Sequence, residues 1–159
     1  ISHKEEHGFE LLQGKDCFEG RLLGGCLESL YDILTTTRYE DEKAVCEKYG
    51  LFPGIEEWKD KILFIETCEE KPAPERFEKE VAILKEKGVF DVVSGVLVGK
   101  PQDEAYYEAY KEILVKVVNR PELPIVYNVN FGHATPRCAL QYGVMAKVDM
   151  KKKRIYLDN

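Results

Sequence analysis

The strongest indication of the fold is the apolar run Lys61-Ile62-Leu63-Phe64-Ile65-Glu66. Short runs of this kind, rich in β-branched and aromatic residues, are typical of strands that are buried on both faces. The run stops on a carboxylate. We therefore predict a buried strand that ends at Glu66, where a side chain on a rigid scaffold can face a cleft.

Helix and strand patterns alternate on both sides of this run. Leu27, Leu30 and Leu34 recur with the spacing of a helix that buries one face. A second helix is expected after Pro72 and Pro74, and Gly88 is a natural stop for it. The expected helices cover residues 26–34, 74–88 and 103–118, the expected strands cover 7–12, 61–66, 92–99, 124–127, 144–148 and 155–157, and 40–57 is expected to be a loop with a helical turn. This order predicts one α/β layer domain with a mixed sheet.

Composition excludes several classes of function. The 159 residues carry 23 Lys and Arg against 29 Asp and Glu, a net charge of −6, and 44% are hydrophobic. Such a chain can bury a core and is not typical of disorder. An acidic chain is a poor ligand for nucleic acid, and the one basic run, residues 151–154, is interpreted as a turn between two strands. No apolar run is long enough to span a membrane and no secretory signal is visible, so we expect a cytoplasmic protein.

Cysteine usage supports the same compartment. The five cysteines are odd in number and none are spaced as Cys-x-x-Cys, which favours reduced thiols over a disulfide framework. Close pairs of zinc ligands are not found, so neither a metal nor a cofactor is expected.

Two residues are candidates for acid–base chemistry. Glu66 ends the buried strand, with a solvated strand end or a cap for the next element as the structural alternative. His133 follows a buried strand in a loop punctuated by Gly132 and Pro136, and histidine is the natural proton shuttle near neutral pH. An ordinary surface histidine is the alternative here.

A base and its orienting carboxylate need a nucleophile, and none is well placed. Ser2 lies in the polar leader with His3 and His7, Ser29 falls on the exposed side of a helix, and Ser94 lies within a strand. None of these serines has the strand-to-helix turn that exposes a nucleophilic serine. Cys138 is close to His133 in sequence but has a similar difficulty. The chain therefore offers two of the three members of a catalytic triad.

The glycine clusters leave two interpretations open. Gly24 and Gly25 precede an expected helix, where free backbone N–H groups bind an anion such as a carboxylate; a tight turn is the alternative. Residues 95–101 lack the glycine spacing and the Ser or Thr of a phosphate-binding loop, so nucleotide binding of that type is excluded.

Taken together, the motifs resemble the C-terminal domain of the LD-carboxypeptidase family of serine peptidases, which includes murein tetrapeptide carboxypeptidases and microcin C self-immunity proteins. The resemblance spans most of the chain and is carried, in this order, by Gly20-Arg21-Leu22-Leu23-Gly24-Gly25, Trp58-Lys59-Asp60-Lys61-Ile62-Leu63-Phe64-Ile65-Glu66, Gly95-Val96-Leu97-Val98-Gly99, Phe131-Gly132-His133 and Gly143.

The resemblance implies a β/β/α layered domain of the swivelling type and a Ser-Glu-His triad divided between two domains. Glu66 and His133 match the family's glutamate and histidine, while the serine belongs to an N-terminal domain outside this chain. Arg21, Gly24 and Gly25 are expected to bind substrate. Two departures put substrate choice in doubt: Cys26 stands where many members have Asn, and Gln141 where Pro is common.

Residues 1–159 are thus expected to form the C-terminal catalytic half of a cytoplasmic serine carboxypeptidase, which is inactive alone and forms a homodimer. The chain begins at Ile1 without an initiator Met, which fits this expectation. The substrate is expected to be a murein tetrapeptide with an L,D bond or a microcin-like aminoacyl nucleotide. The Ile-Glu-Thr form and the acidic stretch before Trp58 favour the microcin-immunity branch. The alternatives are a non-catalytic binding or regulatory module and catalysis by Cys138.

Overall fold

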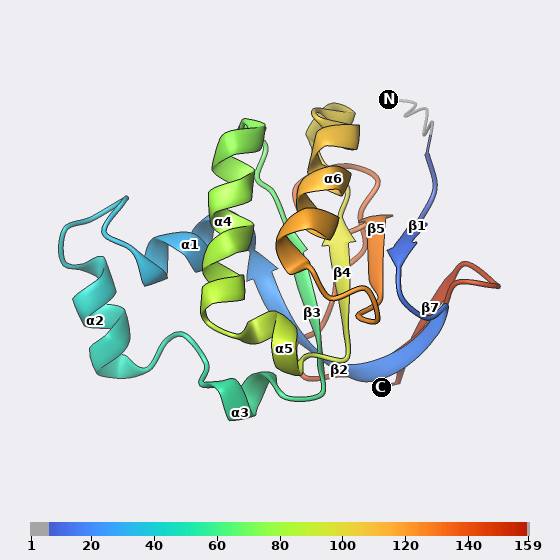
Figure 1. Ribbon diagram of the computed structural model, residues 1–159, viewed down its shortest axis with the longest axis horizontal. Helices are drawn as coiled ribbons and strands as arrows, with labels where there is room; N and C mark the ends of the chain where they lie inside the picture. The colour runs from blue at the N-terminus through green and yellow to red at the C-terminus, as the bar shows by residue number, and fades with distance from the viewer. Residues whose placement is uncertain (1–6, 159) are drawn as a thin grey trace.

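The structure, a computed structural model, describes residues 7–158, so the predictions about Ser2 and His3 lie outside it. The strands form one sheet in the order β1-β5-β4-β3-β2-β6-β7 (Figure 1). Their bounds are β1 Glu10–Gln13, β2 Cys17–Cys26, β3 Lys61–Glu66, β4 Gly95–Gly99, β5 Ile125–Val129, β6 Met145–Asp149 and β7 Arg154–Asp158. The predicted strand 61–66 is therefore confirmed with its bounds.

The centre of the sheet is parallel and its edges are antiparallel. β2, β3, β4 and β5 run parallel, whereas β1 pairs antiparallel with β5 and the β6–β7 hairpin pairs antiparallel with β2. The parallel strands β3, β4 and β5 are buried almost throughout, because helices cover one face and the curled part of the sheet covers the other. The predicted α/β fold with a mixed sheet is confirmed.

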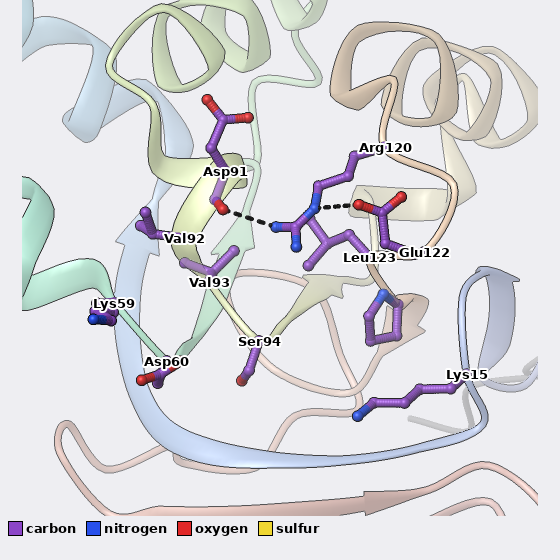
Figure 2. Close-up of a pocket in the computed structure, with 11 residues that line it drawn as sticks. Lys15, Lys59, Asp60, Asp91, Val92, Val93, Ser94, Arg120, Glu122 and Leu123 are labelled. Atoms are coloured by element: carbon purple, nitrogen blue, oxygen red, sulfur yellow. Dashed lines mark hydrogen bonds and ion pairs between the residues drawn. The ribbon is translucent and has the colours of Figure 1, made fainter.

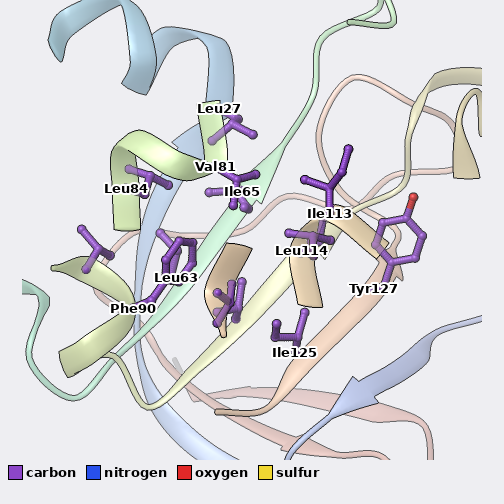
Figure 3. Close-up of a cluster of buried hydrophobic side chains, with 14 of the residues drawn as sticks. Leu27, Leu63, Ile65, Val81, Leu84, Phe90, Ile113, Leu114, Ile125 and Tyr127 are labelled. Atoms are coloured by element: carbon purple, nitrogen blue, oxygen red, sulfur yellow. The ribbon is translucent and has the colours of Figure 1, made fainter. Parts of the chain in front are cut away.

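The helices lie on one face of the sheet. In Figure 1, α4 and α6 stand side by side in front of the strands, with α1 beside them. Alternation along β3 turns Leu63 and Ile65 toward this layer, where they join Val81 of α4 and Leu114 of α6 in one buried cluster (Figure 3). The helices are α1 Leu27–Leu34, α2 Glu42–Tyr49, α3 Ile55–Trp58, α4 Pro74–Glu86, α5 Val89–Val92 and α6 Tyr107–Val118, with a short 3-10 turn, η1, at Gln102–Glu104.

The opposite face of the sheet is covered by the sheet itself. Ile62 and Phe64 of β3 point to this side and belong to a second buried cluster. The cluster also contains Phe18 of β2 and Ala146 and Val148 of β6, because the long strand β2 sweeps around and carries the hairpin under the centre of the sheet (Figure 1). The result is a layered domain, and Glu66, two residues after Phe64, is turned toward this second face.

Three local predictions are wrong. Gly24 and Gly25 lie in β2, paired with Phe64 and Ile65 of β3, so the alternative of a tight turn is wrong, although a helix does follow them, since α1 begins at Leu27. Glycine has no β propensity, so only pairing with β3 reveals this strand. A Cβ on Gly24 would lie 1.8 Å from the carbonyl oxygen of Phe64, so close strand contact demands glycine there.

The other two errors are in helices. Residues 42–49 form the two-turn helix α2, which is almost wholly exposed and so lacks a clear apolar face. Val92 ends the short helix α5 instead of starting a strand, since the helical turn from Gly88 delays β4 to Gly95. The other predicted elements agree within a few residues, including the basic turn between β6 and β7, but the sequence did not predict the strand β2. No helix among residues 7–158 is long and apolar enough to cross a membrane.

Candidate active site

Glu66 sits at the carboxyl end of β3 in a space kept open by two glycines. Its residue exposure is 7%, so the predicted alternative of a solvated strand end is excluded. A Cβ on Gly99 of β4 would lie 2.6 Å from Glu66 Cβ, and a Cβ on Gly132 would lie 2.5 Å from Glu66 Oε2. Both distances are shorter than van der Waals contact. The two glycines therefore let the strand end and the loop after β5 close around one carboxylate.

His133 is presented by that loop. Phe131 anchors the loop on the sheet, because its ring meets Phe64 edge-on with centroids 5.9 Å apart. Gly132 has φ +93°, a conformation that favours glycine and that turns the chain toward Glu66. The Cys138 amide donates to the Asn130 carbonyl at 2.8 Å, and Arg137 donates to the His133 carbonyl at 3.0 Å. These contacts hold the histidine in one place.

Glu66 and His133 are in direct contact. The distances from His133 Nδ1 to Glu66 Oε2 and Oε1 are 2.8 and 3.1 Å, and the His133 backbone amide donates to Oε2 at 3.1 Å. A carboxylate can only accept, so it selects the tautomer with a proton on Nδ1. The hydrogen bond that His133 donates to Glu66 raises the pKa of the histidine above its ordinary value, against the opposing effect of burial. The structure thus brings together the two predicted acid–base residues.

Two further carboxylates lie close by, and the sequence reasoning missed both. Glu69 Oε2 is 3.5 Å from His133 Nε2, and the negative charge of Glu28 also raises the pKa of the histidine. Glu28 accepts from the Cys68 amide at 3.0 Å and from Cys26 Sγ at 3.2 Å. The sequence alone could have pointed to Glu69, because it follows Glu66 by three residues. Glu28 is distant in sequence from both Glu66 and His133, so only the fold reveals it.

No described serine or cysteine forms a hydrogen bond with His133. Ser94 donates to the carbonyls of Glu19 and Lys61 at the amino end of the parallel strands, the end opposite Glu66. Ser29 is exposed in the first turn of α1. Cys138 Sγ donates to the Asn130 carbonyl at 3.0 Å.

The thiols nearest to Glu66 are unreactive at neutral pH. Cys26 pairs with Glu66 in the β2–β3 register, and burial raises the pKa of its thiol to about 11. Burial likewise raises the pKa of Cys68 to about 12. Both thiols are therefore protonated, and a protonated thiol is a weak nucleophile and metal ligand. In the described part of the chain, no three His, Cys, Asp or Glu side chains are grouped to hold a metal ion.

The residues predicted to bind substrate lie along β2. β6 pairs with β2 only as far as Arg21, and two further backbone hydrogen bonds join Leu22 to Gly143 and Val144, so the segment of Gly24 and Gly25 is paired on the β3 side alone. This segment adjoins Glu66. Arg21 pairs with Lys61 at the other end of β3, roughly 16 Å along the strand from the level of Glu66. It donates to the Gly143 carbonyl at 2.8 Å and lines a surface hollow with Gln141 and Tyr142.

A separate hollow opens at the amino ends of the parallel strands (Figure 2). Ser94, which precedes β4, and Pro124, which precedes β5, lie on its wall. Arg120 points across it and donates to the carbonyls of Phe90 and Asp91, while its Nε contacts Glu122 at 2.7 Å. This arginine joins α5 to the turn after α6. The hollow is distant from His133, because Glu66 and His133 lie at the carboxyl ends of the parallel strands. The residues that line the hollow therefore take no part in the acid–base pair.

An α/β domain that holds Nδ1 of a histidine against a buried carboxylate has the arrangement of a hydrolase acid–base pair. Residues 19–148 match the LD-carboxypeptidase C-terminal domain, and the chain belongs to this peptidase family.

Known relatives agree with this assignment. The chain is 29% identical over 152 residues to a putative carboxypeptidase of Treponema pallidum, covering 93% of this chain and 39% of that protein. It is 28% identical over 145 residues to the microcin C7 self-immunity protein MccF of Escherichia coli, covering 89% and 37%. An MccF-like protein from Streptococcus pneumoniae, crystallised with AMP, is 51% identical with a TM-score of 0.94, covering 99% and 46%. The chain thus spans less than half the length of these relatives.

Proposed function

We propose that this chain is the C-terminal catalytic part of a serine-type carboxypeptidase and supplies Glu66 and His133 to a Ser-Glu-His triad. The observation that carries the proposal is the 2.8 Å contact of His133 Nδ1 with a buried carboxylate, which leaves Nε2 on a side chain that is 41% exposed. The serine is proposed to come from an N-terminal domain of the same polypeptide. Matching less than half of each relative's length is consistent with a second domain.

In the proposed reaction, His133 Nε2 removes the proton of the serine hydroxyl as the oxygen attacks the carbonyl carbon of an amide near a free carboxyl end. Glu66 keeps the imidazole oriented and stabilises its charged form. The protonated Nε2 then donates to the nitrogen of the leaving amine, and the amide bond breaks to give an acyl-serine. Water then gives a proton to Nε2 and attacks the acyl carbon, and Nε2 returns this proton to the serine oxygen as the bond to the acyl group breaks and the acid is released.

The substrate is proposed to be the L,D-peptide bond of a murein tetrapeptide or a microcin C-like peptidyl or aminoacyl nucleotide. Solved structures of MccF hold glutamyl sulfamoyl guanosine and aspartyl sulfamoyl adenosine, which supports the second class. Gly24 and Gly25 are proposed to meet the substrate through the edge of β2 that β6 leaves unpaired, beside Glu66. Arg21 is proposed to contact the substrate from the hollow that it lines with Gln141 and Tyr142. A cytoplasmic role in murein recycling or microcin resistance, as a homodimer, follows from the same proposal.

The test is an assay of the full-length protein against a murein tetrapeptide and an aminoacyl adenylate analogue, side by side. Hydrolysis of at least one is expected, and Glu66→Gln should lower its kcat by about 10³–10⁴-fold, since the amide cannot stabilise the imidazolium. Glu112→Gln, which removes an exposed carboxylate on α6, is the matched control and should change little. Near-normal turnover of the Glu66 variant would remove this residue from the triad.

A non-catalytic binding or regulatory module is the second candidate. It is favoured by the AMP held by the pneumococcal MccF-like protein and by the lack of a nucleophile beside His133 among the described residues. Such a module would bind an adenylate in the full-length protein without turning it over. Its affinity would be unaffected by Glu66→Gln. Turnover that depends on Glu66 would exclude it.

A further inference from the structure

The segment from Glu66 to Glu69 lies along both ring nitrogens of His133. Glu66 contacts Nδ1 at 2.8 Å, and Glu69 Oε2 lies 3.5 Å from Nε2. These carboxylates differ in setting, because the Glu66 side chain is 8% exposed and that of Glu69 is 68% exposed. One contact is therefore built into the core of the site, and the other is made by a solvent-exposed side chain.

The backbone that carries Glu69 is held in place. Thr67 is 4% exposed, and the amide of Cys68 donates to the Glu28 carboxylate at 3.0 Å. Glu28 belongs to α1, which packs against α4 and the end of β2. The helix layer thus fixes the chain one residue before Glu69, so the Glu69 carboxylate stays within reach of the imidazole.

We propose that Glu69 is a positioning residue, a second and displaceable carboxylate that occupies Nε2 of His133 and holds the ring in its protonated, resting form until the nucleophile arrives. This inference rests on the proposed function, because in that reaction Nε2 is the atom that must accept the proton of the serine. Glu69 acts through His133 and takes no part in bond making or breaking.

The charges around His133 support this role. Glu66 from β3, Glu69 from the following segment and Glu28 from α1 are negative. On the positive side, Arg137 of the same loop donates to the His133 carbonyl, and the buried residue Lys100 follows β4 at this edge of the sheet. A neutral imidazole donates from one nitrogen only, whereas an imidazolium donates from both. The two-sided contact with carboxylates therefore favours the protonated ring.

Removal of Glu69 then has a defined consequence. Without that charge, His133 loses its proton more readily and becomes available as a base at lower pH. A unit charge 3.5 Å away in a well-solvated setting corresponds to a change of about 0.3–0.8 pH unit in the titration midpoint. The buried contact with Glu66 is untouched, so the ring keeps its orientation.

The first experiment follows the imidazole resonances of His133 against pH by NMR in the 159-residue chain, assigned by their absence in His133→Ala. Glu69→Gln should lower the midpoint by about 0.3–0.8 pH unit, and Glu69→Asp should retain most of the wild-type value. Glu70→Gln is the matched control: it removes the same charge from the next residue, which is also exposed but, within residues 7–158, forms no ion pair with His133. Its effect should be less than half as large.

The second experiment measures kcat/KM of the full-length protein against pH. In Glu69→Gln the acidic limb should move to lower pH by the same amount as the NMR midpoint. A midpoint within 0.1 pH unit of wild type, or equal to that of Glu70→Gln, would overturn the assignment. A full-length wild-type protein that hydrolyses neither substrate refutes the proposed function. In that case, the expected shift of the His133 midpoint by Glu69→Gln in the 159-residue chain still supports the Glu69–His133 contact.

Discussion

Gly132→Ala tests whether the loop that carries His133 and the end of β3 that carries Glu66 are packed so closely that only glycine fits between them. In the wild type, Gly132 has φ +93°, and an added Cβ would lie 2.5 Å from Oε2, 2.6 Å from Cγ and 2.7 Å from Cδ of Glu66. To lengthen these distances to an ordinary van der Waals contact, Gly132 and Glu66 must move apart by about 1 Å. Glu66 cannot retreat toward β4, because Gly99 already lies against its Cβ. The loop must therefore move, and His133 moves with it.

Two effects of different size follow. The backbone conformation strains a residue with a side chain, which costs about 1–3 kcal/mol of stability. A displacement of about 1 Å in the contact between the base and its orienting carboxylate lowers kcat by about 10²-fold. We also expect the raised pKa of His133 to fall, because the hydrogen bond to Glu66 is its main cause.

The assay combines chemical denaturation, His133 titration by NMR and turnover of the full-length protein. Gly50→Ala is the matched control, since Gly50 has φ +60° at the end of α2 and a Cβ there meets nothing within 4 Å. The control should lose stability but keep its turnover and its His133 titration. A Gly132→Ala variant with turnover within threefold of wild type and an unchanged titration would refute the account of a shared, tightly filled site.

Three other predictions concern the core, a buried charge and the thiol alternative. Phe77→Ala should cost about 3–5 kcal/mol in urea denaturation, because its fully buried ring stacks on Tyr110 at 4.0 Å; a loss under 1 kcal/mol would contradict the packing. Burial raises the pKa of Glu80 to about 7, so the native state keeps a proton that the unfolded state loses above pH 4.5. Stability should therefore fall by about 2–3 kcal/mol between pH 5 and 8, and Glu80→Gln should flatten this curve in denaturation at several pH values. Cys138→Ala should leave turnover of the full-length protein within twofold of wild type, because the thiol is hydrogen-bonded to Asn130; abolished turnover would revive catalysis by cysteine.

The elements that the sequence predicts well are those whose burial is local and regular. β3 is an uninterrupted apolar run, and α4 and α6 show an apolar stripe, so their patterns alone identify them. The segment of Gly24 and Gly25 shows the opposite case. Its two glycines carry no β signal, and the segment is a strand because it pairs with β3, whose backbone leaves no room for a side chain at Gly24.

The candidate site was only partly predictable for the same reason. Glu66 and His133 each stand out as a polar residue after a buried strand, but they are 67 residues apart and only the fold brings their side chains into contact. Glu28 looks like an ordinary helix residue in the sequence. Its bond to the Cys68 amide depends on how α1 docks beside the end of β3, which no local pattern encodes.

The most direct test of the Glu66–His133 pair is the turnover of the full-length protein carrying His133→Ala, measured across pH with the better of the two substrates. His7→Ala is the control, since His7 pairs with Glu104 at 3.0 Å and stacks on Tyr107, in contact with neither Glu66 nor His133. We expect His133→Ala to lower kcat by about 10⁴-fold or more while His7→Ala retains it. Activity that survives in His133→Ala with an unchanged pH profile would contradict the account.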